Sequence, residues 1–236
     1  MKAASGVLSF LPSLGGRKPV LDWDKFSISF AKILDRRPTG REISQVSSYL
    51  SLLLRWDRVH SLTGYRQPEV IVDRLFLDSL LFLHYLPDPD PSPAAVRVLD
   101  LGSGAGIPGI PLKIVRPEYE VTLVEARRKR ASFLSAVVRE LELHGVSVLT
   151  GRAESLLDDI PGLKGGFDVV VTRAAGRPKA VLHAALAFLK PGGRFVASGR
   201  PLKDPSPITV PGGCWQALVS PASGRQRQFL IVPKIS

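Results

Sequence analysis

Three glycines alternate with other residues directly after a short apolar run, and this segment is the part of the chain best suited to bind a ligand. Residues 96–101 form the apolar run, Gly102, Gly104 and Gly106 follow it, and Pro108 comes two residues later. Glycine adopts the positive φ angles of a tight turn and lets a ligand approach the backbone, and Pro is favoured at the first position of a helix. A strand, a glycine turn and a helix in this order predict a nucleotide-type ligand at the carboxyl end of the strand.

Two carboxylates bear on which nucleotide-type ligand this is. Residues 104–109 also spell G-x-G-x-x-G, the fingerprint of dinucleotide sites, so an NAD-dependent oxidoreductase is one alternative. Asp100 lies just before the glycines, where its carboxylate can meet the cationic end of a methionine moiety but would repel a pyrophosphate. Glu125 follows about 20 residues later, where either cofactor presents a pair of ribose hydroxyls. Asp100 therefore favours S-adenosylmethionine over NAD.

Short apolar runs alternate with amphipathic stretches from residue 96 onward. Strands that alternate with helices are typical of an α/β fold with a doubly wound, mostly parallel sheet. Helices are predicted over residues 108–115, 127–144 and 179–189. Strands are predicted over residues 96–101, 121–124, 146–149, 167–172, 194–197 and 229–232.

Pro and Gly residues divide the chain into three predicted parts. Residues 1–21 are predicted to be a flexible tail. Residues 22–93 are predicted to form an N-terminal helical extension, in which a second helix begins near Pro68 and a Pro-rich linker follows. Residues 94–236 then form the α/β domain that carries the glycine turn. The length of 236 residues suits this arrangement of one domain with an extension.

Positive charge is concentrated in the α/β part of the chain. The formal net charge of +11 divides into +2 for residues 1–93, +6 for residues 94–200 and +3 for residues 201–236. The run 127–130 opens a predicted helix with four cations, which oppose the helix dipole, so a phosphate-rich partner explains the run better than local stability does. The candidates for contact with a phosphate-rich partner such as RNA are Arg128, Lys129, Arg130, Arg177, Lys179, Arg200 and Lys203.

Several kinds of chemistry are excluded by residue type. The single cysteine, Cys214, excludes an internal disulfide framework and a cysteine-based metal cluster, and the four histidines lack metal-ligand spacing. Methyl transfer to an exocyclic amine usually involves a D/N-P-P-Y/F stretch after the fourth strand, where this chain has Thr172-Arg173-Ala174-Ala175.

No apolar run reaches the roughly 18 residues needed to span a bilayer. We therefore expect a cytoplasmic monomer with neither a metal nor a membrane partner.

The segment Asp100–Gly109 (DLGSGAGIPG) resembles the glycine loop of the ribosomal RNA small subunit methyltransferase G family, also called glucose-inhibited division protein B. The resemblance implies a Rossmann-like class I S-adenosylmethionine-dependent methyltransferase fold. It also implies an enzyme that methylates N7 of a guanine in the 530 loop of 16S rRNA in the small ribosomal subunit. Further segments that match the family are 121–134 (VTLVEARRKRASFL), 151–154 (GRAE), 168–174 (DVVVTRA), 56–63 and 76–80 (FLDSL).

The same resemblance implies roles for individual residues. Arg173, after the predicted fourth strand, would line the pocket for cofactor and target base as a positioning group, and no general base is assigned. Glu125, with Ala126 and Arg127 after it, would hold the ribose and adenine side, and Ala153 and Glu154 would flank the adenine. The cofactor-binding residues beside these are Asp100, Gly102, Gly104, Gly106 and Ile107.

The chain departs from the family pattern at three positions. Ser61 stands where an Asn is frequent, Leu75 where a His is common, and Ser198 where a Lys is usual, with Arg200 close enough to substitute for it. These departures concern RNA contact and leave the cofactor residues intact. They keep open a methyltransferase for another RNA or for a small molecule. A non-enzymatic RNA-binding protein is a further alternative.

Overall fold

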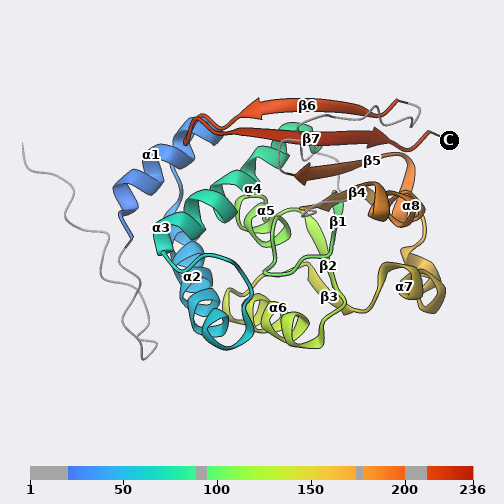
Figure 1. Cartoon of the computed structure of the whole chain (residues 1–236), viewed down its shortest axis with the longest axis horizontal. Coiled ribbons are helices and arrows are strands. Elements are labelled where there is room, and N and C mark those ends of the chain that lie inside the picture. The colour runs from blue at the N-terminus through green and yellow to red at the C-terminus, as the bar shows by residue number, and fades with distance from the viewer. Residues whose placement is uncertain (1–20, 89–94, 174–177, 200–211, 236) are drawn as a thin grey trace, which may run out of the picture.

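A computed structural model of the chain describes residues 21–88, 95–173, 178–199 and 212–235, and these build one seven-stranded sheet with helices on both faces (Figure 1). The strand order is β3-β2-β1-β4-β5-β7-β6. Neighbours from β3 to β5 are parallel, and β7 runs antiparallel to both β5 and β6. The strands are β1 (Arg97–Leu101), β2 (Glu120–Glu125), β3 (Val146–Thr150), β4 (Phe167–Thr172), β5 (Leu189–Gly199), β6 (Cys214–Val219) and β7 (Gln226–Pro233).

The six predicted strands are confirmed, and two details of the sheet differ from the prediction. β6 was not predicted: it is an edge strand whose residues are exposed or half-buried, so it lacks the apolar run of a buried strand. β5 begins at Leu189 instead of 194, because Leu189 already pairs with Phe167. The register then shifts across the Pro191-Gly192-Gly193 segment before pairing resumes at Arg194.

The helices gather in two layers against the sheet. The predicted helix from Pro68 is confirmed, although it passes through a π-helical stretch and ends in a 3₁₀ turn. The predicted helix 127–144 ends at Glu140, because Glu142 (φ 50°) and Gly145 (φ 71°) adopt left-handed backbone conformations. A short helix after β3, α7 (Ala153–Asp159), was not predicted. The helices are α1 (Trp23–Leu34), α2 (Gly40–His60), α3 (Pro68–Ile71), η1 (Val72–Leu77), α4 (Asp78–Leu80), η2 (Leu81–Tyr85), α5 (Gly109–Val115), α6 (Arg128–Glu140), α7 (Ala153–Asp159), η3 (Pro161–Leu163) and α8 (Pro178–Phe188).

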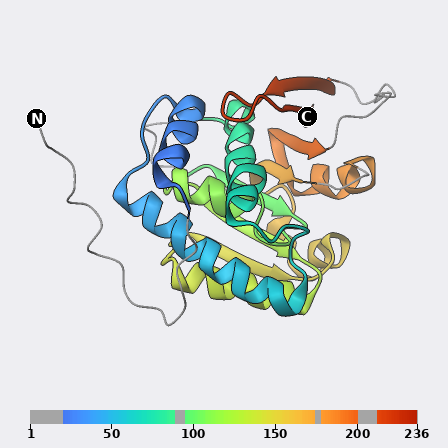
Figure 2. The ribbon, with the colours of Figure 1, turned by 60° about the vertical axis from the view of Figure 1, so that its left-hand side comes forward.

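The N-terminal helices pack directly on the part of the sheet that carries the glycine turn. One hydrophobic core joins residues of α1 to α4 with residues of α5, α6 and the sheet, while α7 and α8 pack on the opposite face (Figure 1). α2 runs beside α6 (Figure 2), where the rings of Trp56 and Phe133 lie 5.7 Å apart. The hydroxyl of Tyr49 in α2 donates a hydrogen bond of 2.7 Å to the carbonyl of Ala105 in the turn. The predicted boundary near residue 93 stays a prediction, since the described residues on either side of it share this core.

The end of α2 explains one departure from the family pattern. Ser61 follows the helix with φ 46° in the left-handed region, and its amide donates to the carbonyl of Asp57. Glycine and asparagine tolerate this conformation better than serine does. An Asn at this position therefore has a backbone role that Ser61 performs with more strain.

We expect the substitution Ser61→Gly to raise the free energy of unfolding by about 1 kcal/mol, because it relieves the left-handed strain at an exposed position. Urea denaturation monitored by circular dichroism measures the change. The matched control is Ser51→Gly, which places the same residue in the interior of α2 and should lower the free energy of unfolding by about 0.5 kcal/mol. Equal effects of the two substitutions would contradict the prediction.

Candidate active site

The glycine turn after β1 is shaped by three positive φ angles. Gly102, Gly104 and Gly106 have φ of 76°, 57° and 83°. A Cβ built on Gly102 would meet no atom within 4 Å, so this glycine faces open space into which a ligand can move. A Cβ on Gly106 would lie 2.5 Å from Cγ1 of Ile110. The turn is therefore packed tightly against α5 at one end and open at the other.

Glu125 at the end of β2 fixes the position of this turn. Its side chain is 6% exposed, and β2 lies beside β1 in the sheet. Oε2 accepts a hydrogen bond of 2.9 Å from the amide of Gly104, and Oε1 accepts one of 2.8 Å from the amide of Arg127. Each carboxylate oxygen has a second lone pair, so Glu125 can shape the turn and still accept hydrogen bonds from a ribose.

Asp100 lies beneath the turn, deeper than the sequence suggested. Its side chain is fully buried, and Oδ2 accepts a hydrogen bond of 2.9 Å from the amide of Gly109. Oδ1 is also buried and has no hydrogen-bond partner among the described residues. Burial raises the pKa of this carboxyl to about 7, against the opposing effect of the Gly109 amide. An unpartnered carboxylate oxygen under an open turn fits a cationic group of a ligand.

Ala153 and Glu154 begin α7, one strand further along the sheet. β3 pairs with β2 so that Thr150 lies opposite Glu125, and the amide of Gly151 donates to the carbonyl of Glu125. Ala153 is half-buried and Glu154 is exposed. The order of the strands thus brings the predicted adenine-flanking pair to the same edge of the sheet as the predicted ribose-binding carboxylate.

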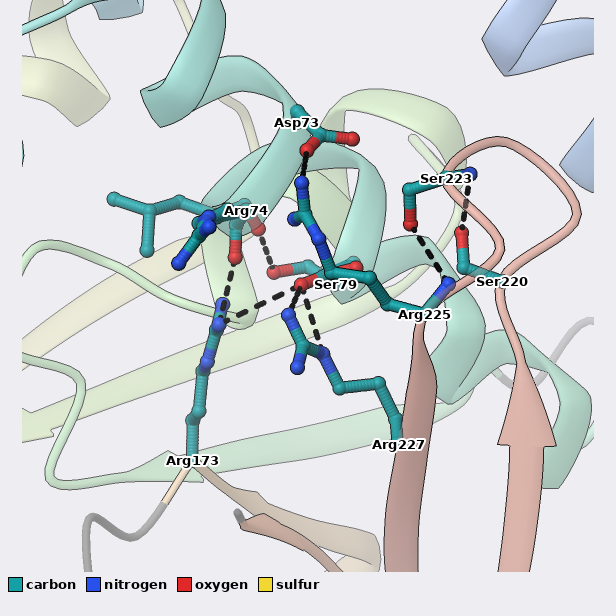
Figure 3. A network of polar contacts seen from close by, with 10 residues as sticks. Asp73, Arg74, Ser79, Arg173, Ser220, Ser223, Arg225 and Arg227 are labelled. Carbon is teal, nitrogen blue, oxygen red and sulfur yellow. Dashed lines mark hydrogen bonds and ion pairs between the residues drawn. The ribbon is translucent and has the colours of Figure 1, made fainter. Parts of the chain in front are cut away.

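Arg173 follows β4 and turns toward the N-terminal helices (Figure 3). Its Nη2 donates a hydrogen bond of 2.6 Å to the carbonyl of Arg74 and lies 3.9 Å from Oδ2 of Asp78. Its Nη1 is buried and has no partner in the described part of the chain. Burial lowers the pKa of this guanidinium, although Asp78 opposes the effect. Asp78, which also binds Arg227, was not singled out in the sequence, where it is one acidic residue within an apolar segment.

The predicted RNA-contact residues divide into described and undescribed ones. Arg128 and Lys129 are exposed at the start of α6, beside exposed Ala126 and Arg127. Arg130 is half-buried, and its Nη1 would lie 3.6 Å from a Cβ on Gly104, so it borders the turn. Lys179 belongs to α8, but its side chain lies outside the described part of the structure. Arg177, Arg200 and Lys203 lie outside the described residues altogether, as does most of the predicted tail and linker.

A hollow that the sequence did not indicate lies at the end of α2. It has a volume of about 630 Å³ and is lined by side chains of the helix end and the segment after it. Two of these, Arg58 and Arg66, are cations. The lining residues are Leu54, Asp57, Arg58, Ser61, Thr63, Gly64 and Arg66.

Metal ligands and membrane-spanning helices are not found among the described residues. No group of three or more His, Cys, Asp or Glu side chains there could hold a metal ion. No helix in the same part of the chain is long and apolar enough to cross a bilayer. The other two departures from the family pattern, Leu75 and Ser198, are both buried.

Comparison with known proteins identifies relatives of this chain. Residues 42–200 match the model of a family described as rRNA small subunit methyltransferase G. A protein of that name from Desulfitobacterium hafniense is 39% identical over 160 residues, which cover 68% of this chain and 64% of that protein. Another from Methylobacillus flagellatus is 32% identical over 188 residues, which cover 79% and 86%. The chain thus spans just under two thirds of the length of the first relative.

A solved structure from Klebsiella pneumoniae, described as an O-methyltransferase, has the same fold. It superposes with a TM-score of 0.56 at 16% sequence identity and covers 91% of this chain and 98% of its own. The predicted fold class is therefore confirmed: the chain has a Rossmann-like class I methyltransferase fold, with β6 and β7 as an antiparallel hairpin and additional N-terminal helices.

Proposed function

Because the chain belongs to the rRNA small subunit methyltransferase G family, we propose that it transfers a methyl group from S-adenosylmethionine to N7 of a guanine in the 530 loop of 16S rRNA. Its substrate would be the small ribosomal subunit or its RNA, and it would act as a cytoplasmic monomer. The observation that carries the proposal is the open glycine turn, which is fixed by Glu125 and underlain by the unpartnered Oδ1 of Asp100. A dinucleotide would bring a pyrophosphate toward that carboxylate, which disfavours the oxidoreductase alternative.

The residues around the turn fit each part of the cofactor. Glu125 would accept hydrogen bonds from the ribose hydroxyls, with Ala126 and Arg127 next to it. Ala153 and Glu154 would flank the adenine. Asp100 would face the ammonium of the methionine moiety and Arg173 its carboxylate, while Gly102, Gly104, Gly106 and Ile107 would supply the backbone of the cradle. When bound, S-adenosylmethionine supplies an activated methyl group on a sulfonium.

Methylation of guanine N7 requires no general base. N7 carries an exposed lone pair, so no proton has to leave before it attacks the methyl carbon. The residues of the pocket therefore need to orient two reactants and exclude water, and a strong general base is unnecessary. A guanidinium such as that of Arg173 suits this task, because it donates hydrogen bonds in a fixed geometry and so orients the group that accepts them. It stays protonated and does not act as a base.

The cations at the start of α6 would bind the RNA backbone. Arg128 and Lys129 are exposed, and Arg130 borders the glycine turn, so a phosphate held there would lie beside the cofactor. Lys179, Arg177, Arg200 and Lys203 would extend this surface. Binding by several such cations predicts a steep loss of affinity with rising salt concentration.

The test is a transfer assay with radiolabelled S-adenosylmethionine and small ribosomal subunits that lack the modification. We expect one label per particle, located by mass spectrometry at N7 of a guanine in the 530 loop. Deproteinised 16S rRNA in a parallel reaction shows which form of the substrate the enzyme requires. Cofactor binding without any label on 16S rRNA would overturn the substrate, and binding of RNA without cofactor would favour a non-enzymatic RNA-binding protein.

A further inference from the structure

Three segments far apart in the sequence meet at the carboxylate of Asp78. Asp78 begins α4, its side chain is 3% exposed, and its Oδ2 accepts hydrogen bonds from both Nε (2.9 Å) and Nη2 of Arg227 in β7. The same oxygen forms an ion pair of 3.9 Å with Nη2 of Arg173. One carboxylate thus connects the N-terminal helices with the end of β4 and the start of β7.

Each charge in this cluster depends on the others. Burial raises the pKa of Asp78, while hydrogen bonds from Arg227 and the charge of Arg173 oppose that rise. Burial likewise lowers the pKa of Arg173, and the charge of Asp78 opposes that fall. A buried charge whose partner is removed is strongly destabilised, so loss of the Asp78 carboxylate would leave Arg173 and Arg227 facing each other without compensation.

The position of Arg173 relative to the glycine turn places this cluster beside the predicted cofactor site. β1 and β4 are parallel neighbours, with Asp100 opposite Val171, so Arg173 leaves the sheet beside the end of β1. The start of β7 reaches the same edge, because Gln228 pairs with Gly199 at the end of β5. Ligands of open α/β sheets bind at the carboxyl ends of the parallel strands. The unpartnered Nη1 of Arg173 is therefore buried at the edge where the cofactor would lie.

We propose that Asp78 is a positioning residue for the cofactor: held by Arg227, it fixes the guanidinium of Arg173 so that Nη1 can donate to the carboxylate of the methionine moiety. This inference rests on the proposed function, since it takes S-adenosylmethionine as the ligand. With Asp100 facing the ammonium, the ends of β1 and β4 would hold the two charges of one amino acid group. The carbonyl of Arg74 accepts a hydrogen bond from Nη2, the same nitrogen that pairs with Asp78, so Nη1 is left free to donate to a ligand.

The test is a double-mutant cycle on the affinity for S-adenosylmethionine, measured by isothermal titration calorimetry. We expect Asp78→Asn to raise the Kd about 20-fold and Arg173→Ala to raise it about 30-fold. If Asp78 acts through Arg173, adding Asp78→Asn to the Arg173→Ala protein should change the Kd less than about 3-fold. Equal effects of Asp78→Asn in both backgrounds would overturn the inference, because they would show a structural role only.

A second pair of variants provides the control and a milder perturbation. Asp73→Asn weakens the neighbouring 2.7 Å ion pair between Asp73 of η1 and Arg225, which does not include Arg173, and should leave the Kd within about 2-fold of wild type. Arg227→Lys keeps the charge but loses the two-nitrogen contact with Asp78, and should raise the Kd about 5-fold. It decides the question if Asp78→Asn does not fold: an unchanged Kd would overturn the inference. A wild-type protein that binds no S-adenosylmethionine would overturn the proposed function as well, whereas tight binding without methylation of 16S rRNA would overturn only the substrate.

Discussion

Replacement of Glu125 by alanine is expected to raise the Kd for S-adenosylmethionine about 100-fold. The carboxylate would hold the ribose. It also accepts hydrogen bonds from the amides of Gly104 and Arg127, and these two hydrogen bonds set the shape of the turn. A hydrogen bond to a charged group contributes about 1.5–3 kcal/mol, and about 3 kcal/mol of lost binding free energy corresponds to roughly a 100-fold change in Kd. Isothermal titration calorimetry on the purified variant measures it.

Two further variants separate the ribose contact from the general effect of removing a charge. Glu125→Gln keeps one acceptor oxygen but replaces the other by an amide donor that faces a backbone N–H. The Kd for S-adenosylmethionine is therefore expected to rise about 10-fold. Glu120→Ala removes an exposed acid from the opposite end of the same strand and should leave the Kd unchanged. Wild-type affinity in the Glu125→Ala protein would mean that the ribose is held by other residues.

The sequence was sufficient to predict elements whose residues are buried on both faces. Val169, Val170 and Val171 are fully buried in β4, and such an uninterrupted apolar run is typical of a central parallel strand. β6 could not be predicted in this way, because an edge strand buries little and its composition is close to that of a loop. The extension of β5 back to Leu189 depends on a shift in register, which is a property of the pairing with β4 and leaves no local pattern.

In the candidate site, too, features encoded by local sequence patterns could be predicted, and features made by tertiary contacts could not. The glycine turn and Glu125 could be predicted because a strand, a turn and the end of the adjacent strand are encoded by local patterns, and the amide of Gly104 does donate to that carboxylate. The contact between Asp78 and Arg227 joins residues 149 positions apart, so only the tertiary structure brings them together. The complete burial of Asp100 could not be predicted either. The apolar residues of this segment indicate a strand, but they do not show that the start of α5 covers the end of that strand.

Asp100 is expected to make the unfolding free energy fall by about 4 kcal/mol as the pH rises from about 4 to about 7. Burial raises the pKa of this carboxyl to about 7, whereas an aspartate in an unfolded chain titrates near pH 4. Between these values the folded chain binds more protons than the unfolded chain, so its stability is greatest at the acidic end and is lost as the pH rises through the folded pKa. The measurement is urea denaturation across this range for the wild type and for Asp100→Asn.

The comparison with Asp100→Asn isolates this effect from other titrating groups. Asparagine can still accept the hydrogen bond from the Gly109 amide but never ionises, so contributions from carboxyls such as Asp78 and Glu42 cancel in the difference between the two proteins. The stability of the variant relative to the wild type should therefore increase steadily with pH. Saturating S-adenosylmethionine should reduce that difference, because its ammonium favours the ionised carboxylate and gives the wild type additional stabilisation at high pH. Parallel curves without ligand would mean that Asp100 has the same pKa in the folded and unfolded chains, and a ligand effect equal in both proteins would place the ammonium away from Oδ1.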